Sequence, residues 1–471
     1  MSGAHSVAIL GAGPAGLGLA YRLSLRRKFD VTVLERGEKV GGNAASFPLC
    51  GMRVDFGSHR LHPSCAPEIL EDLRSFLGPD LLDRPRHGRI RLRNRWVHFP
   101  LKPLDLAAHL PITFLAGVGV DGIARSIHRG EGETFADVLQ AGLGKTICRD
   151  FYFPYARKIW GCDPAELDGE QARRRVSAGS LSKMIRKVLQ AVPGLKRKGS
   201  GRFFYPRQGF GSISESYAGA ALREGVKIKL LTSVGAVETV GGRVRAVQAI
   251  GPTGQEWVNA DHVCSTIPIS QLLRVLHPAA PDQVLASACG LQFRAMILVY
   301  LVLETEQFTE FDAHYFPNSD IAVTRLSEPK NYGLADFPGR TILCAELPCS
   351  MDDPIWRKSD VELGGIVKSA LEAAEIPIRS KIAGVCSRRL PHAYPIYLRG
   401  YKEHFARMDQ WLQSIQGLVT FGRQGLFAHD NTHHALAMAY AVDECLGEDG
   451  EFNRELWSRR RHEFQKHVVE D

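Results

Sequence analysis

A short glycine-rich stretch near the start of the chain limits the folds that the whole chain can adopt. Residues Ser6–Leu10 form an apolar run, followed by Gly11-Ala12-Gly13-Pro14-Ala15-Gly16. Residues Leu17–Leu25 then have a pattern that permits a helix. A buried strand, a glycine turn and a helix start in this order are typical of a βαβ unit that binds a dinucleotide.

Each glycine of this turn has its own physical role. Gly11 permits the tight turn, and Gly13 lets the backbone approach a pyrophosphate without a Cβ atom in the way. Gly16 lets the helix pack closely against the strand. Pro14 and Ala15 lie between these glycines at the helix start, where backbone N–H groups and a partial positive charge favour phosphate. The turn therefore predicts a phosphate-binding site.

A second strand and an acidic residue strengthen this prediction. Val31–Leu34 is typical of a strand, and Glu35 ends it nineteen residues after Gly16. A carboxylate at this place can accept hydrogen bonds from a ribose. The alternative is a glycine-rich turn in an ordinary βαβ unit that binds no nucleotide.

The residues after Glu35 indicate which dinucleotide is bound. Val40-Gly41-Gly42-Asn43 is a second glycine turn just past the acidic residue. This stretch resembles the N-terminus of the superfamily of amine oxidases, protoporphyrinogen oxidases and UDP-galactopyranose mutases. The resemblance implies FAD as the cofactor rather than NAD.

Composition limits the class of protein. The 471 residues are too many for one ordinary core, so two or three domains are expected. The net charge of +8 suits an anionic substrate or a phosphate-rich cofactor, and it is too diffuse to predict nucleic-acid binding. The ten cysteines have no CxxC pair, and no signal peptide is recognised, which favours reduced thiols in a cytoplasmic protein.

The order of strand and helix patterns predicts an α/β fold with a Rossmann-type FAD-binding domain, an inserted helical domain and a mixed, largely antiparallel substrate-side sheet. Pro67–Leu77, Ser212–Arg223 and Thr432–Leu446 read as helices, and Ile321–Leu326 as a strand. The expected domains are the FAD-binding domain in three parts (1–66, 201–275 and 416–450), connecting strands (67–103), a helical insert (104–200), the sheet domain (276–415) and a charged tail (451–471).

Two segments have patterns whose environment the sequence must decide: the protein core, a membrane surface or solvent. Leu110–Val120 is the most apolar stretch, but it is too short to span a bilayer, which needs roughly 20 residues. We expect a buried helix there, with a monotopic membrane contact as the alternative. The tail from Asn453 onward is charged and amphipathic, and a solvated helix is its simplest interpretation.

Five later stretches extend the resemblance over nearly the whole chain, in the same order as in the mutases. They are Tyr155–Gly161, Thr324–Lys330, Glu346–Pro348, Ala393–Pro395 and Gly422–Arg423. The resemblance places Trp160 in a nucleotide-sugar cleft and Arg325 near flavin and sugar. The local alternatives are a core tryptophan, an arginine at a strand end and a proline in a turn.

The resemblance also implies a role for other residues. Ser58 and His59 belong to a loop that lies against the isoalloxazine ring in the resembled superfamily, although a surface loop with incidental histidines is an alternative. Val234 matches a residue whose backbone pairs with adenine, and simple core packing is its alternative. Arg423 can supply a cation to the pyrophosphate, and a helix that starts at Thr432 can place its positive end near flavin N1 and O2.

These arguments give three sets of predicted site residues. The catalytic residues are His59, Arg325 and Tyr394, and the substrate-binding residues are Trp160, Arg174 and Tyr397. The FAD-binding residues are Gly11, Gly13, Pro14, Ala15, Gly16, Glu35, Arg36, Gly42, Asn43, Ser58, His59, Val234, Gly422, Arg423 and Thr432. No HExxH motif, cysteine ligand set or serine elbow is found, so we predict no metal and no acyl transfer.

Two positions depart from the mutases. Ala178 stands where they carry an arginine that binds the substrate diphosphate, and Asn431-Thr432-His433 replaces their Asp-Met-Asp. We therefore expect an FAD-dependent oxidoreductase that transfers a hydride between flavin N5 and a sugar, a nucleotide-linked sugar or a secondary metabolite. The alternatives are a mutase that uses reduced FAD as a nucleophile and a flavin-binding subunit without turnover. Oligomeric state is not predictable from these features.

Overall fold

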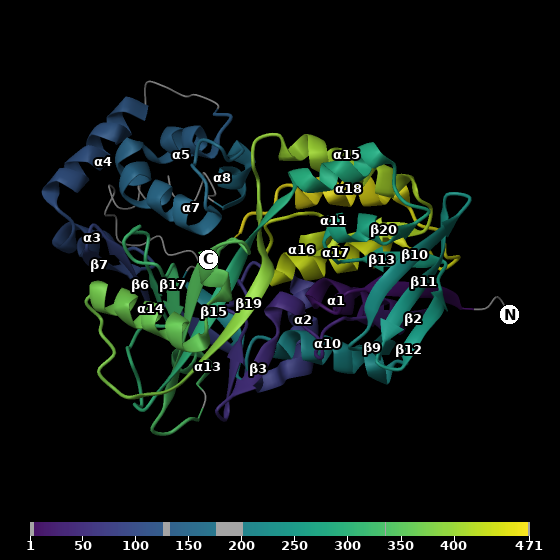
Figure 1. Ribbon diagram of the computed structural model, residues 1–471, viewed down its shortest axis with the longest axis horizontal. Helices are drawn as coiled ribbons and strands as arrows, with labels where there is room; N and C mark the ends of the chain where they lie inside the picture. The colour runs from purple at the N-terminus through teal and green to yellow at the C-terminus, as the bar shows by residue number, and fades with distance from the viewer. Residues whose placement is uncertain (1–3, 126–131, 176–200, 335, 470–471) are drawn as a thin grey trace.

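The computed structural model describes residues 4–125, 132–175, 201–334 and 336–469 (Figure 1). One unit is built on a sheet with the strand order β20-β13-β1-β2-β9, in which all neighbours are parallel. Val7 and Ile9 of β1 enter one hydrophobic core, whereas Ala8 and Leu10 enter another, so both faces are covered as in other parallel sheets. The strands are β1 (His5–Leu10), β2 (Phe29–Leu34), β9 (Lys227–Lys229), β13 (His262–Ser265) and β20 (Leu418–Thr420).

Helices cover one face of this sheet. In Figure 1, α1 lies between α17 and α10, and it packs against both. Pro67, at the first turn of α2, has no N–H to leave unsatisfied. The helices of this face are α1 (Pro14–Leu25), α2 (Pro67–Leu77), α10 (Ser212–Arg223), α17 (Thr432–Cys445) and α18 (Arg454–Phe464).

A small second sheet and three helices cover the other face. The sheet has the order β12-β11-β10-β14, and apolar residues of both sheets share one core. The elements of this layer are β10 (Ser233–Val240), β11 (Arg243–Gly251), β12 (Gly254–Asn259), β14 (Leu276–His277), α11 (Ile269–Arg274), α12 (Asp282–Ser287) and α15 (Tyr401–Ser414).

The predicted substrate-side sheet is confirmed as largely antiparallel. Its order is β19-β15-β18-β17-β16-β6-β7, and only the β16–β6 pair is parallel. The prediction of a strand at Ile321–Leu326 is wrong in its bounds, because β17 begins at Arg325, and β16 was not predicted. The elements are β6 (Gly88–Leu92), β7 (Arg95–Phe99), β15 (Gln292–Leu303), β16 (Ala313–Tyr315), β17 (Arg325–Ser327), β18 (Thr341–Cys349), β19 (Ile382–Ile396) and the covering helix α14 (Asp360–Ala373).

The helical insert lies at the upper left of Figure 1, above this sheet. The first turn of its helix α5 is capped locally, because Thr134 and Asp137 form a reciprocal capping box there. Ala178 and the other residues of 176–200, at the end of the predicted insert, lie outside the described residues. The described elements are α3 (Pro103–His109), α4 (Ile112–Arg125), α5 (Phe135–Leu143), α6 (Lys145–Ile147), a π-helical turn (Cys148–Tyr152), α7 (Phe153–Trp160) and α8 (Gly169–Arg175).

The expectation of a buried helix at Leu110–Val120 is wrong. The helix breaks before Pro111 because proline disfavours helical backbone in the residue that precedes it. In α4, Ile112 is 77% exposed and Val120 66% exposed, while Phe114 and Val118 are buried. The segment is therefore amphipathic. Among the described helices, none is long and apolar enough to cross a membrane.

The interpretation of the tail as simply solvated is also wrong. Trp457 and Phe464 of α18 are buried in the core that contains α1 and α17. After α18 the chain runs on toward the centre of the molecule, where Figure 1 marks its end. The remaining elements are β3 (Ser46–Leu49), β4 (Met52–Asp55), β5 (Leu81–Pro85), β8 (Arg202–Pro206), α13 (Lys330–Gly333), α16 (Gly422–Gly425) and four 3₁₀ turns (Gly42–Ala44, Gly78–Asp80, Ala288–Gly290 and Pro354–Arg357).

Candidate functional site

A cavity of about 510 Å³ lies where the parallel sheet, the antiparallel sheet and the helical insert meet. Each unit contributes to its lining: the glycine turn after β1, strands β17 and β18, and helices α7 and α8. The carboxyl ends of parallel strands are where open α/β sheets bind their ligands, because the strand order reverses there. The cavity is thus the candidate site.

The glycine turn leaves open space at one end of this cavity. Gly11, Gly13, Pro14 and Ala15 line it. Gly13 is the N-cap of α1, no side chain caps that helix end, and a Cβ atom added to Gly13 would meet nothing within 4 Å. Gly42 lies against Gly13, with its added Cβ 3.7 Å from the Gly13 Cα atom. This open cradle at a helix N-terminus fits a dinucleotide pyrophosphate.

Glu35 holds the first glycine turn next to the segment that leads to the second. Its Oε2 atom accepts a hydrogen bond from the Ala12 N–H group at 2.9 Å, and its Oε1 atom accepts one from Gly37 at 2.7 Å. The Gly41 N–H group donates to the Ala12 carbonyl at 2.7 Å. Glu35 lines the cavity, so the same carboxylate is placed for the predicted ribose contact. The sequence spacing alone did not indicate its role in the turn.

The other predicted residues of this end are close by. Arg36, Asn43 and Val234 all line the cavity, and the Asn43 side-chain amide donates to the His392 carbonyl at 3.2 Å. The open glycine cradle and the polar groups around it fit the adenosine and pyrophosphate part of FAD.

His59 is a half-buried imidazole at the wall of the cavity. Its Nε2 atom lies 2.9 Å from the Phe56 carbonyl, and its ring stacks on Phe210 with the centroids 5.2 Å apart. A carbonyl can only accept, so Nε2 carries the proton and Nδ1 has a free lone pair. Burial lowers the pKa of His59 below its ordinary value, although Asp55 partly offsets this effect. His59 can therefore accept a proton at Nδ1.

An ion pair of the antiparallel sheet contacts the loop that carries Ser58 and His59. Arg325 donates from Nε and from Nη2 to Glu346 Oε1 at 2.9 and 2.6 Å. The Ser58 N–H group donates to the same oxygen at 3.1 Å. All three residues line the cavity. The pair thus fixes the loop that carries Ser58 and His59.

A third group surrounds Tyr394. The Arg423 guanidinium lies 5.2 Å from the centre of the Tyr394 ring, and the Arg175 guanidinium lies 5.3 Å from it. Arg423 also donates from Nη2 to the Ala393 carbonyl at 2.7 Å, and burial lowers the pKa of its guanidinium. Thr432, the first residue of α17, lines the cavity as well, so the predicted helix start there is confirmed.

Five predicted residues lie behind the cavity wall rather than on it. An added Cβ at Gly16 would lie 2.0 Å from the Gly11 carbonyl oxygen, and one at Gly422 would lie 2.9 Å from the Ala15 Cβ atom. These two glycines therefore permit close packing around the turn. The other three are Trp160, Arg174 and Tyr397.

The residues predicted to bind substrate are placed mainly by packing. Trp160 is 4% exposed and packs edge-on against Phe135. The residue before it, Ile159, lines the cavity. The Arg174 side chain donates to Glu170 at 3.0 Å, and Tyr397 is 2% exposed. Their direct contact with a substrate stays a prediction.

Sequence reasoning left several lining residues out of the predicted site, and four of them matter for the arguments below. Arg60 follows His59 in the quoted loop, so its position there was the only available signal. Arg86, Asp430 and Val469 also line the cavity, and each comes from a segment without a recognised motif. Only the tertiary structure brings them to the site.

Comparison with known proteins agrees with this geometry. The sequence model for flavin containing amine oxidoreductase matches residues 14–373. A reduced UDP-galactopyranose mutase structure has 19% identity and a TM-score of 0.78, with 93% of each chain covered. A protein from Exiguobacterium sp. 255-15, assigned as a protoporphyrinogen oxidase, has 20% identity and a TM-score of 0.71, with 93% of this chain and 98% of that chain covered.

A third structure, putrescine oxidase bound to putrescine, has 16% identity and a TM-score of 0.65, with 93% of this chain and 98% of that chain covered. At these identities the structures show a shared fold. The family match covers most of the chain, and the open glycine cradle fits the cofactor of that family. The chain belongs to the flavin-containing amine oxidoreductase family, and it is an FAD-dependent enzyme.

Proposed function

We propose that this enzyme transfers a hydride between FAD and an anionic small molecule of the sugar or nucleotide-sugar type. The observation that carries the proposal is the charge of the cavity. Among the described residues that line it, six are arginines and three are acids. When bound, the flavin supplies the hydride-accepting or hydride-donating atom N5.

Four of the six arginines are left once the cofactor phosphates are considered. Arg36 and Arg423 are the arginines that we assign to the FAD phosphates. Arg60, Arg86, Arg175 and Arg325 line the rest of the wall, where Asp312 pairs with Arg60 at 3.2 Å and Glu346 pairs with Arg325. A desolvated wall of this kind attracts phosphate or carboxylate and repels an ammonium group.

This charge argues against a diamine substrate. Putrescine, which is bound in one of the structures of similar fold, carries two ammonium groups. Another protein of similar fold is named as a mutase of UDP-galactopyranose, a compound that carries a diphosphate. The arginine-lined wall supports the second kind of ligand, because every arginine offers N–H donors and a fixed positive charge to phosphate oxygens.

The protein groups have separate roles in the proposed reaction. His59, with its unprotonated Nδ1 atom, accepts the proton of a substrate hydroxyl when a C–H bond is oxidised. Arg325 binds the anionic or developing alkoxide oxygen. Tyr394, held between Arg175 and Arg423, forms an apolar wall with polar edges and limits water at the reacting carbon.

An anaerobic titration tests the reaction class. Oxidised enzyme is mixed with UDP-galactose, with neutral galactose or with putrescine, and the flavin absorbance is followed. We expect near-stoichiometric bleaching by an anionic compound and none by putrescine. Bleaching by putrescine alone would overturn the proposal. If reduced enzyme interconverts pyranose and furanose forms over many turnovers without consuming reductant, the chain is a mutase.

Arg325 provides a matched test of the substrate contact. In Arg325→Met, Glu346 stays buried without its cation, and we expect a loss of about 3–5 kcal/mol in the free energy of unfolding. The double variant Arg325→Met/Glu346→Gln removes both charges, so we expect it to regain much of this stability and its FAD, but not its turnover. Recovered turnover in the double variant would show that Arg325 is only structural.

A further inference from the structure

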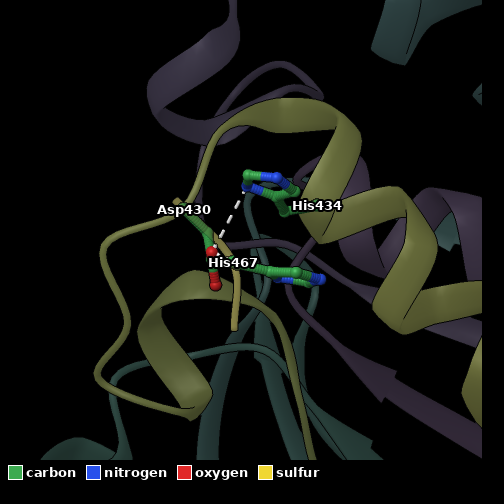
Figure 2. Close-up of side chains that lie close together, drawn as sticks. All are labelled: Asp430, His434 and His467. Atoms are coloured by element: carbon green, nitrogen blue, oxygen red, sulfur yellow. Dashed lines mark ion pairs between the residues drawn. The ribbon is translucent and has the colours of Figure 1, made fainter. Parts of the chain in front are cut away.

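A cluster of one carboxylate and two imidazoles lies beside the cavity. Figure 2 shows Asp430, in the loop before α17, facing His434 of α17 and His467, which follows α18. The Nδ1 atoms of His434 and His467 lie 3.4 and 3.3 Å from the same oxygen, Asp430 Oδ1. The Asp430 side chain has no exposed surface. A buried carboxylate thus holds two segments that are distant in the sequence.

The charge of Asp430 is retained in spite of its burial. Burial alone would raise the pKa of this carboxyl, but the two nearby histidines outweigh that effect and bring its pKa to about 2. Arg174, from α8 of the helical insert, also lies within electrostatic range of Asp430. The carboxylate therefore lies near two imidazoles and one guanidinium from three separate parts of the chain.

The segment 465–469, which we call the tail segment, is fixed at a second point. The Val469 N–H group donates to the Arg174 carbonyl oxygen at 2.8 Å. Val469 lines the cavity, and so do Asp430 and Arg175. The tail segment thus joins α18 of the FAD-binding unit to α8 of the helical insert, across the edge of the site.

The ring geometry favours an ion-pair latch over a metal centre. The rings of His434 and His467 are stacked face to face, with centroids 4.2 Å apart and an interplanar angle of 13°. A metal ion lies close to the plane of each imidazole that binds it, and one ion cannot lie in two parallel planes. The Asn431 N–H group donates to the His434 Nδ1 atom at 3.2 Å, so that atom is already engaged and the latch rests on His467.

We propose that the tail segment forms a wall of the substrate end of the cavity, with Val469 as a specificity-determining residue and His467 as the positioning residue that latches it to Asp430. The wall restricts the size of the ligand and the access of solvent to the flavin. This inference rests on the FAD site and not on the identity of the substrate.

Three variants test the latch in the FAD-loaded, tag-free chain. His467→Ala removes the contact to Asp430, and Val469→Pro removes the N–H donor to Arg174. His462→Ala is the control, because His462 is exposed on α18 in the same part of the chain. Quenching of the flavin fluorescence by iodide measures access. FAD content and the unfolding temperature show whether each variant is folded.

We expect the quenching constant to rise at least twofold in His467→Ala and Val469→Pro and to stay unchanged in His462→Ala, with FAD content retained. The conservative variant Val469→Ala keeps the N–H group, so its quenching constant should stay close to that of the wild type. Unchanged quenching in both folded latch variants would overturn the proposal. Stoichiometric binding of added Zn²⁺ that is lost in His467→Ala would also overturn it, because the cluster would then be a metal site.

Discussion

At the scale of single residues, Gly13 and Gly16 have opposite reasons for lacking a side chain. The space in front of Gly13 contains no protein atom within 4 Å, so only a bound pyrophosphate limits it. The space in front of Gly16 is already occupied by the Gly11 carbonyl oxygen, 2.0 Å from an added Cβ atom. One glycine therefore serves the ligand, and the other serves the packing of α1 on β1.

This difference gives a testable contrast. We expect Gly13→Ala to weaken FAD binding roughly tenfold or more, about 1.4 kcal/mol, while the unfolding free energy of the apoprotein changes little. We expect Gly16→Ala to destabilise the apoprotein by about 1–3 kcal/mol, because backbone must move to admit the methyl group. Denaturant unfolding of the apoprotein and titration with FAD measure the two effects. Equal effects of both variants on the apoprotein would contradict this assignment.

Residue positions were predictable where the motif is local. The glycine turn and Glu35 lie within 25 residues of one another, and their spacing in the sequence fixes their spacing in space. Arg86 reaches the cavity from the loop between β5 and β6, and Val469 reaches it from the tail segment nearly 400 residues later, so no local pattern could identify them. The ion-pair partners of predicted residues could not be identified from the sequence either, and Glu346 as the partner of Arg325 is an example.

At the scale of elements, helix α1 depends on a close contact with α17. An added Cβ at Gly18 of α1 would lie 2.9 Å from a Leu436 methyl group and 3.2 Å from the Ala439 Cβ atom. Both helices begin at the cavity, with Gly13 as the N-cap of α1 and Thr432 as the first residue of α17. Their separation thus sets the distance between two groups that we assign to the FAD site.

A glycine in another helix of the same layer gives a control. We expect Gly18→Ala to lower the free energy of unfolding by about 1–3 kcal/mol and to weaken FAD binding, because it wedges α1 away from α17. Gly219 lies in α10, where an added Cβ would meet only the Arg223 guanidinium at 3.7 Å. We expect Gly219→Ala to raise the free energy of unfolding by about 0.5–1 kcal/mol. Thermal unfolding of the two apoproteins checks the opposite signs.

Elements were predictable where pattern and end signals agree. Pro67–Leu77 and Ser212–Arg223 were predicted with the bounds that the structure has, since proline marks the first start and a break in periodicity marks the second end. The prediction of a buried helix at Leu110–Val120 was wrong, because a high apolar content does not show which face of a helix is covered. The predicted bounds of the strand near Arg325 were wrong, because pairing with the neighbouring strands Ala313–Tyr315 and Thr341–Cys349 decides where this strand begins.

At the scale of the whole molecule, several buried histidines make stability depend on pH. Burial lowers the folded-state pKa of five histidines that lie in different units, so the unfolded chain binds more protons than the folded chain just below pH 6.5. Stability is therefore present above this pH and is lost as the pH falls through it. Asp55 and Glu328, whose pKa values burial raises, oppose the trend in part. The five histidines are His59, His262, His314, His392 and His429.

His314 allows one of these contributions to be measured. It is 1% exposed, Trp96 and Phe316 lie against its ring, and burial together with Arg89 lowers its pKa well below the ordinary value. Between pH 7.5 and 5.5, protonation of this histidine in the unfolded chain alone costs up to about 1.4 kcal/mol of stability. We expect His314→Phe to reduce the loss of unfolding free energy over this interval by that amount, as measured by denaturant unfolding at both pH values. An unchanged pH dependence would show that His314 is already protonated in the folded protein, in which case a nearby carboxylate must stabilise its charge.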